Sequence, residues 1–174
     1  MTRQHIGCWF FGILASGLYI ISCFHAKIYL EAGLNFYYVA VGFYGWHLWL
    51  KKNGNKKNET LQITEWRAIA HIVNILICVA LTILLGRIEQ KYTSSPRPFF
   101  DAAITVFGFS ATILEARKVL SAWIYWFIIN GATVVLMLDR SMPIYALQYA
   151  VLTALCVKGY LDWRKSKAHV GDNK

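Results

Sequence analysis

The segment WIYWFIIN, residues 123–130, carries two tryptophans and one amide at positions that fall on one side of a helix. Trp123, Trp126 and Asn130 stand at i, i+3 and i+7, so 3.6 residues per turn place them on one face. A face that met only lipid would gain nothing from Asn130, because its amide would find no water in the hydrocarbon. The spacing therefore predicts that this face meets either a ligand or another helix.

The three side chains suit a flat, positively charged ring. Trp is the best cation–π partner, worth up to about 2 kcal/mol when the contact is desolvated. Asn130 offers a donor and acceptors to a hydroxyl or a carboxamide. The segment has no acidic residue on this face. We therefore expect a cation to be held here by π faces and dipoles, an arrangement that also permits its release.

Each candidate also has a structural interpretation. Trp123 lies near one end of its apolar run, where Trp commonly sits at headgroup depth. Asn130 could instead clamp a neighbouring helix, a contact worth roughly 0.6–2 kcal/mol. Asn35 and Gln148, in two other apolar runs, are candidates for either role, and Tyr38 is a further pocket candidate.

Long uncharged runs surround the motif. The 174-residue chain is 57% hydrophobic and only 16% charged, whereas soluble domains carry about 25% charged residues. A bilayer core of about 30 Å requires ~20 apolar residues as a helix, and continuous runs favour helices over the alternating strands of a barrel. We expect an all-α integral membrane protein with six membrane-spanning helices, at about residues 6–24, 28–50, 68–86, 99–115, 119–138 and 141–161.

The formal charge of +9 is unevenly distributed between the two sides of the membrane that these spans define. Twelve Lys and Arg residues fall on the side that holds both termini, and five fall on the other side. Cytoplasmic loops are enriched in these residues, so both termini are predicted to be cytoplasmic. Basic loops beside anionic lipid account for the charge without a nucleic acid partner.

The reactive residue types give no sign of an enzyme or a metal site. The four cysteines lie inside the apolar runs with no short paired spacing, which is typical of buried apolar residues. No H-E-x-x-H or G-x-S-x-G motif and no clustered metal ligands occur. We expect no catalytic residues, metal or cofactor. The first run also has the length of a signal peptide, an interpretation that five further spans disfavour.

The chain matches itself when it is shifted by 114 residues. The shift pairs Arg3 with Arg117, Trp9 with Trp123, Gly17 with Gly131, Gly45 with Gly159 and Trp49 with Trp163. Both copies start on the same side, so they are parallel repeats related by an axis along the membrane normal, as in SWEET-type transporters. The span at 68–86 becomes a linker. Nothing in the first copy matches the span at 99–115, so we expect the first repeat to lack its opening helix.

This repeat defines the expected organisation. Residues 1–50 form a first, incomplete repeat of two helices, and 51–98 hold a cytoplasmic loop, the linker helix and an outer loop. Residues 99–165 form the second, three-helix repeat, and 166–174 form a basic cytoplasmic tail. Two explanations fit the lacking helix: a start codon assigned too late, or a natural short form that fills the gap by self-association into a homo-oligomer.

The segment LEARKVLSAWIYWFIIN (114–130), with its W-x-x-W-x-x-x-N pattern, resembles the signature region of PnuC-type vitamin transporters. Residues 8–49 and 100–118 resemble the N-terminal half of that family and the helix before its motif. The resemblance implies a 3+1+3 helix bundle in the bacterial plasma (inner) membrane. It assigns Trp123, Trp126 and Asn130 to the substrate site.

The same resemblance implies the activity. It indicates facilitated diffusion of nicotinamide riboside, which is then trapped by cytoplasmic phosphorylation, with thiamine and riboflavin as alternative substrates. Asn35 stands where nicotinamide riboside carriers often have Gln, and residues 134–149 differ from the usual family pattern. A multipass membrane enzyme and a non-transporting membrane subunit are the competing function classes.

Overall fold

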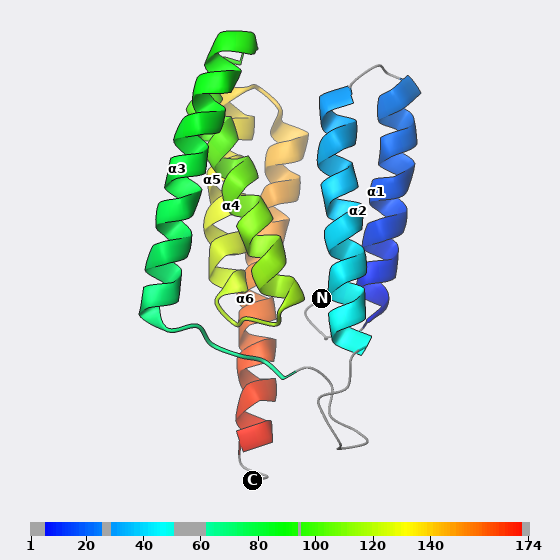
Figure 1. Ribbon diagram of the computed structural model, residues 1–174, viewed down its shortest axis with the longest axis vertical. Coiled ribbons are helices and arrows are strands. Elements are labelled where there is room, and N and C mark those ends of the chain that lie inside the picture. Colours follow the sequence, from blue (N-terminus) through cyan, green and yellow to red (C-terminus); the bar gives the residue numbers. More distant parts are fainter. Residues whose placement is uncertain (1–5, 26–28, 51–61, 94, 172–174) are drawn as a thin grey trace.

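The computed structural model describes residues 6–25, 29–50, 62–93 and 95–171 of the chain (Figure 1). They form six helices, which are α1 (Gly7–His25), α2 (Tyr29–Leu50), α3 (Ala68–Tyr92), α4 (Pro98–Ala116), α5 (Ala122–Asp139) and α6 (Pro143–Gly171). The predicted all-α class and the six helices are confirmed.

Five of these helices are long and apolar enough to cross a membrane: α1, α3, α4, α5 and the part of α6 up to Ala168. The sixth helix, α2, has 22 residues and is therefore about 33 Å long, which is sufficient for a bilayer core. It is less apolar because it carries Asn35, His47 and several tyrosines. Since α2 packs between α1 and α4, protein neighbours are available to these polar and aromatic side chains.

Two helices are longer than the hydropathy pattern indicated. The linker helix α3 ends at Tyr92 rather than near residue 86, and α6 continues to Gly171 rather than ending near residue 161. Part of the predicted basic tail is therefore helical. Residues 162–171 contain no proline, and Lys167 of this extension forms a 2.7 Å ion pair with Glu65. Hydropathy marks where a helix leaves the apolar layer, whereas the backbone hydrogen bonds continue until a breaker intervenes.

Helix α5 begins at Ala122 instead of the predicted 119, because a tight turn ends α4. Lys118 has a φ of 52°, and its N–H donates to the carbonyl of Glu115 while the N–H of Val119 donates to that of Leu114. These two bonds form a Schellman motif, which satisfies the last carbonyls of a helix. Lysine occupies the position that glycine usually takes.

The segment that leads into α3 is tied to this turn. Thr64 pairs with Val119 in an isolated parallel bridge. The Thr64 N–H donates to the carbonyl of Lys118 at 3.0 Å, and the Leu120 N–H donates to the carbonyl of Thr64 at 2.9 Å. The turn is therefore held at a defined position relative to both α3 and α5.

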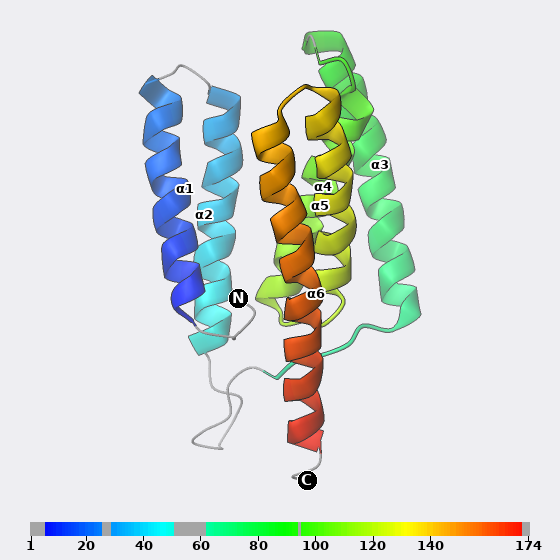
Figure 2. The same cartoon turned by 180° about the vertical axis from the view of Figure 1, so that it is seen from behind.

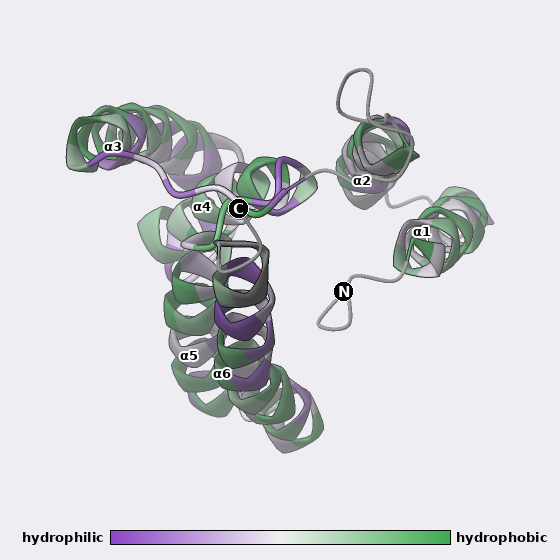
Figure 3. Cartoon of the chain, turned by 90° about the horizontal axis from the view of Figure 1, so that it is seen from below, coloured by the Kyte–Doolittle hydropathy of each residue, from purple (hydrophilic) through white to green (hydrophobic). Residues whose placement is uncertain are grey.

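Helix α4 occupies the centre of the bundle. It contacts α2, α3 and α5, while α1 pairs with α2 and α6 pairs with α5. The α1–α2 pair and the α5–α6 pair lie on different sides of α4 (Figures 2 and 3). Helix α1 begins, and α2, α4 and α6 end, at the same end of the bundle, which is the lower end in Figure 1. The motif residues at the start of α5 belong to this lower end.

Candidate functional site

Trp123 lies in the interior of the bundle. Its exposed fraction is 7%, and its ring meets Trp163 of α6 edge to face, with centroids 5.4 Å apart. A Cβ added at Gly159 would lie 2.5 Å from the Trp123 ring, so only glycine leaves room for the indole there. Trp123 is therefore a packing residue between α5 and α6 rather than a member of a lipid-facing belt.

Trp126, one turn further along α5, is only partly buried and has a polar partner. Its indole Nε1–H donates to Oε2 of Glu115 at 3.0 Å. Glu115 belongs to the last turn of α4 and is 4% exposed. The motif face carries no acid of its own, as the sequence shows, but a neighbouring helix brings a carboxylate to it, so π faces and dipoles are not its sole polar features.

Sequence reasoning missed Glu115 since it precedes Trp123, the first motif residue, by eight residues and stands close to Arg117 and Lys118 at the end of a span. That position looked like the solvated boundary of a helix. One signal was available: an acidic side chain in the last turn of a helix is unfavourable against the helix dipole. A carboxylate at such a position, shortly before the motif helix, indicates that its side chain makes a favourable contact elsewhere.

Asn130 is buried, with an exposed fraction of 6%. Its Nδ2 lies 3.5 Å from Sγ of Cys156 on α6, within the range of a hydrogen bond to sulfur. A thiol is a weak acceptor, so the amide loses little when it exchanges this partner for a ligand oxygen. In this structure the Asn130 side chain therefore links α5 to α6 through a partner that a ligand oxygen can replace.

Four tryptophans at the lower end connect the two helix pairs. Trp9 meets Trp49 edge to face at 5.6 Å with an interplanar angle of 86°, and Trp123 meets Trp163 at 5.4 Å and 88°. Trp49 and Trp163 are 6.2 Å apart and join the two pairs. Since the 114-residue shift pairs Trp9 with Trp123 and Trp49 with Trp163, this packing supports the duplication, which stays a prediction.

The equivalence extends to glycines and to unpaired donors. A Cβ at Gly45 would lie 2.5 Å from the Trp9 ring, as one at Gly159 would from the Trp123 ring. The indole nitrogens of Trp9 and Trp123 are both buried without a hydrogen-bond partner. The first repeat therefore packs a tryptophan against a glycine and a second tryptophan in the same way. However, Gly12 and Ser16 stand at the positions equivalent to Trp126 and Asn130.

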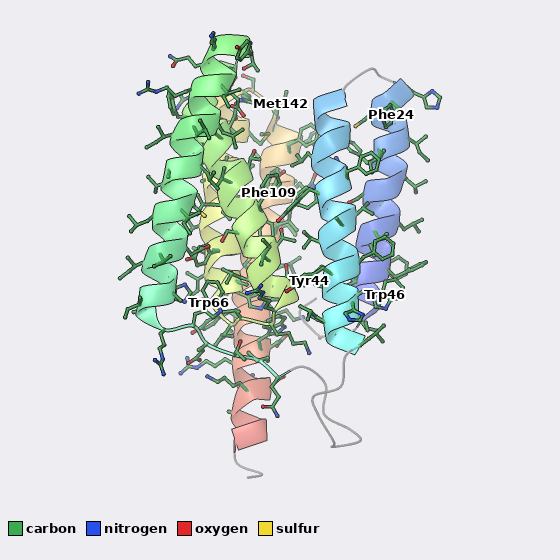
Figure 4. All side chains as sticks on the ribbon, viewed as in Figure 1. Phe24, Tyr44, Trp46, Trp66, Phe109 and Met142 are labelled. Carbon is green, nitrogen blue, oxygen red and sulfur yellow. The ribbon has the colours of Figure 1, made fainter. Side chains whose placement is uncertain are left out.

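The predicted α2 residues face the packing between α2 and its neighbours. Asn35 and Tyr38 are partly buried, and the Tyr38 ring lies 6.2 Å from that of Phe109. Tyr37 is closer to α4, since its hydroxyl donates to the Phe109 carbonyl at 3.0 Å. Figure 4 shows Phe109 and Tyr44 between α4 and α2, with Trp46 on the side of α2 toward α1.

Gln148 is not brought to Asn130. It is exposed and precedes Cys156, the α6 residue that contacts Asn130, by eight residues, which is about 12 Å along a helix. In this conformation it therefore lies nearer the upper end than the rest of the predicted site.

The opposite face of α5 carries a separate polar network. The Tyr125 hydroxyl lies 3.2 Å from Nδ1 of His71 and accepts a hydrogen bond from Asn74 at 3.4 Å. Ser110 donates to Asn74 at 2.9 Å, and Ser121 lies 3.3 Å from Nε2 of His71. A groove of about 470 Å³ beside this network is lined by α3, α4 and α5, without any motif residue. These contacts connect the linker helix α3 to the face of α5 that is opposite the motif residues.

Within the described ranges, no three His, Cys, Asp or Glu side chains gather in a way that could hold a metal ion. The motif face instead combines an indole face, a buried carboxylate and an amide. Such a set can stack on a flat ring, balance a positive charge and bond a hydroxyl or carboxamide.

Comparison with known proteins agrees with the resemblance in the motif. The profile of a family described as nicotinamide mononucleotide transporters matches residues 1–165. The nicotinamide riboside transporter PnuC of Escherichia coli (strain K12) is 22% identical over 193 residues, covering 98% of this chain and 81% of that protein.

Two further proteins are similar. The riboflavin/roseoflavin transporter RibM of Streptomyces davaonensis is 24% identical over 149 residues, covering 85% of this chain and 70% of RibM. A crystal structure of the vitamin B3 transporter PnuC superposes with a TM-score of 0.72 at 21% identity, over 97% of this chain and 75% of that one. The structural likeness establishes the fold.

Proposed function

Because the chain belongs to the nicotinamide mononucleotide transporter family, we propose that it is a membrane carrier for nicotinamide riboside. The observation that carries this proposal is that Trp126, Asn130 and Glu115 lie near one another, beside the packed Trp123 and Trp163 rings. The indole and the carboxylate suit the cationic pyridinium ring. The amide suits the ribose hydroxyls or the carboxamide.

Transport is by facilitated diffusion. A proton-coupled carrier needs a series of ionisable residues inside the membrane. In the part of the chain that the structure describes, the buried acid is at the lower end, whereas Glu89, Asp101 and Arg140 are at the upper end. Net accumulation then requires a cytoplasmic kinase, because a phosphorylated nucleoside no longer fits a site that contains a carboxylate.

The proposal extends to the surroundings of the carrier. It lies in the bacterial plasma membrane with both termini in the cytoplasm, it uses no cofactor, and it performs no catalysis. Residues 1–50 and 99–165 act as the two related halves, with 51–98 as linker. The similarity to RibM makes riboflavin the second candidate substrate. Thiamine is the third, since its thiazolium ring is also a flat cation.

Uptake into proteoliposomes tests the function. We expect purified protein to equilibrate labelled nicotinamide riboside across liposomes without any ion gradient, and to accumulate it only when a nucleoside kinase and ATP are enclosed. Parallel measurements with thiamine and riboflavin identify the vitamin. Concentrative uptake driven by an ion gradient with no kinase present would show that the mechanism is wrong. Absence of uptake for all three vitamins would favour a non-transporting subunit.

A further inference from the structure

Glu115 occupies a position that is costly for a carboxylate. It is 4% exposed, and burial of a charge without compensation is strongly unfavourable. It also lies in the last turn of α4, where the carbonyl end of the helix repels negative charge. Packing alone would be better served by an apolar residue. The acid is held here by its hydrogen bond with the Trp126 indole, and a cation beside it would stabilise its charged form.

The two basic side chains that follow Glu115 in the sequence contact aromatic residues of α2. The Lys118 ammonium lies over the Trp49 ring, 4.5 Å from its centroid, and the Arg117 Nε–H donates to the Tyr44 hydroxyl at 3.2 Å. In the described part of the chain, the ion pairs involve other carboxylates, and no Lys, Arg or His side chain forms one with Glu115. Its side-chain partner there is the Trp126 indole.

That hydrogen bond makes the Trp126 ring a better receptor for a cation. A carboxylate that accepts the indole N–H polarises the ring toward greater electron density on its faces, as linked hydrogen bonds polarise one another. A ligand ring stacked on Trp126 would also lie close to the carboxylate, because Glu115 accepts the N–H of the same indole at 3.0 Å. At that range a unit charge interacts strongly at the effective dielectric of a partly buried site. Both effects favour a positively charged ring over a neutral one of the same shape.

We propose that Glu115 is the counter-charge of the substrate site and restricts this carrier to flat aromatic rings that bear a positive charge. The inference rests on the proposed function and assigns a residue that the motif does not contain. Pyridinium and thiazolium rings satisfy the criterion. A neutral isoalloxazine ring does not, so this proposal removes riboflavin, which similarity to RibM alone had made the second candidate.

A single pair of ligands isolates the charge. Nicotinamide riboside and its reduced 1,4-dihydro form share the ribose and the carboxamide, but only the oxidised form is a cation. We expect the purified protein to bind the cation at least about tenfold more tightly than the reduced form, measured by calorimetry at pH 7.5. This comparison needs no variant and therefore holds whether or not a mutant folds.

Glu115→Gln then assigns the preference to this residue. The amide oxygen of Gln still accepts the Trp126 N–H, so the indole keeps its position while the charge is lost. We expect the Kd of the cation to rise at least about tenfold and the Kd of the reduced form to stay within about threefold. Glu65→Gln is the matched control, because it removes an exposed acid at the same end of the bundle and should change neither Kd.

Each outcome decides the proposal. Equal binding of the two ligand forms by the unaltered protein would overturn it, as would Glu115→Gln protein that retains the cation preference. Tighter binding of riboflavin than of nicotinamide riboside would overturn the charge criterion and leave vitamin transport intact. Failure of the unaltered protein to bind any of these ligands would overturn both the charge criterion and the proposed function.

Discussion

The two tryptophans of the W-x-x-W-x-x-x-N motif have different surroundings. Trp123 is enclosed by Trp163 and Gly159, with its indole nitrogen buried and without a hydrogen-bond partner. Trp126 is partly buried, and its nitrogen is held by Glu115. The first is therefore suited to fixing α5 against α6, and the second to contacting a ligand.

Substitution at the motif should separate these roles. We expect Trp126→Ala to remove cation–π binding of up to about 2 kcal/mol, and Asn130→Ala to cost about 1–3 kcal/mol for an unpaired ligand group. In both variants the protein should remain folded and membrane-inserted. Ligand titration together with size-exclusion chromatography in detergent provides the measurement.

Trp123→Ala supplies the contrast, because loss of a buried indole costs about 3–5 kcal/mol of stability. It should lower the melting temperature more than Trp126→Ala does, because Trp126 is only partly buried and its removal mainly leaves the Glu115 carboxylate without its indole partner. Normal vitamin uptake by either Trp126→Ala or Asn130→Ala would mean that the substrate site has been assigned to the wrong residues.

At the scale of the elements, the helix pairs depend on close approach at single glycines. Gly45 admits the Trp9 ring between α1 and α2, and Gly159 admits the Trp123 ring between α5 and α6. In each contact the atoms nearest the glycine belong to a rigid indole ring. A methyl group there must displace a whole indole, and with it the chain of four tryptophans that joins the two pairs.

Alanine substitution tests this dependence. We expect Gly159→Ala and Gly45→Ala to lower thermal stability by about 1–3 kcal/mol through overpacking, and Gly159→Ala to impair transport as well, since Trp123 shares its helix with Trp126. Gly131→Ala is the control, because a Cβ there meets nothing within 4 Å. It should be neutral or stabilising by up to about 1 kcal/mol. The same melting temperature for Gly159→Ala and Gly131→Ala would contradict the claim that the Trp123 ring requires glycine at position 159.

For the whole molecule, the two ends of the bundle are held by different chemistry. The lower end is held by packed indoles, in which the Trp49–Trp163 contact joins the two helix pairs. At the upper end, ion pairs link Asp101 to Arg140 at 2.5 Å and Arg97 to Asp139 at 2.7 Å. A carrier must open each end in turn, and salt weakens exposed ion pairs but not apolar contacts.

The orientation of the molecule is testable with single cysteines. In a background with Cys8, Cys23 and Cys78 changed to Ala and Cys156 to Ser, we place one cysteine at Glu65 or at Lys91, exposed residues at opposite ends. From the positive-inside rule, an impermeant thiol reagent should label position 91 in intact cells and position 65 only in inverted vesicles. The reverse pattern would invert the topology.

Much of the architecture could be predicted because its causes are local in the sequence. Uncharged runs of about twenty residues predict membrane helices, whichever neighbours they have. The i, i+3, i+7 spacing places Trp123, Trp126 and Asn130 on one face for the same reason. Equal spacing of Trp9 and Trp49 with Trp123 and Trp163 indicated a repeat, and the structure gives both tryptophan pairs the same edge-to-face packing.

What only the tertiary structure decided are the contacts made between helices. Helical spacing says which residues share a face but not what that face meets, because this depends on the turn after α4 and on how the pairs approach each other. The Schellman turn at Lys118 brings Glu115 to Trp126, the glycine on α6 encloses Trp123, and the offset along α6 separates Gln148 from Asn130. The sequence by itself determined the helices, the motif face and the family. The acid that meets this face was decided by packing, since a carboxylate at a helix end has the same local sequence pattern whether it points to water or into the bundle.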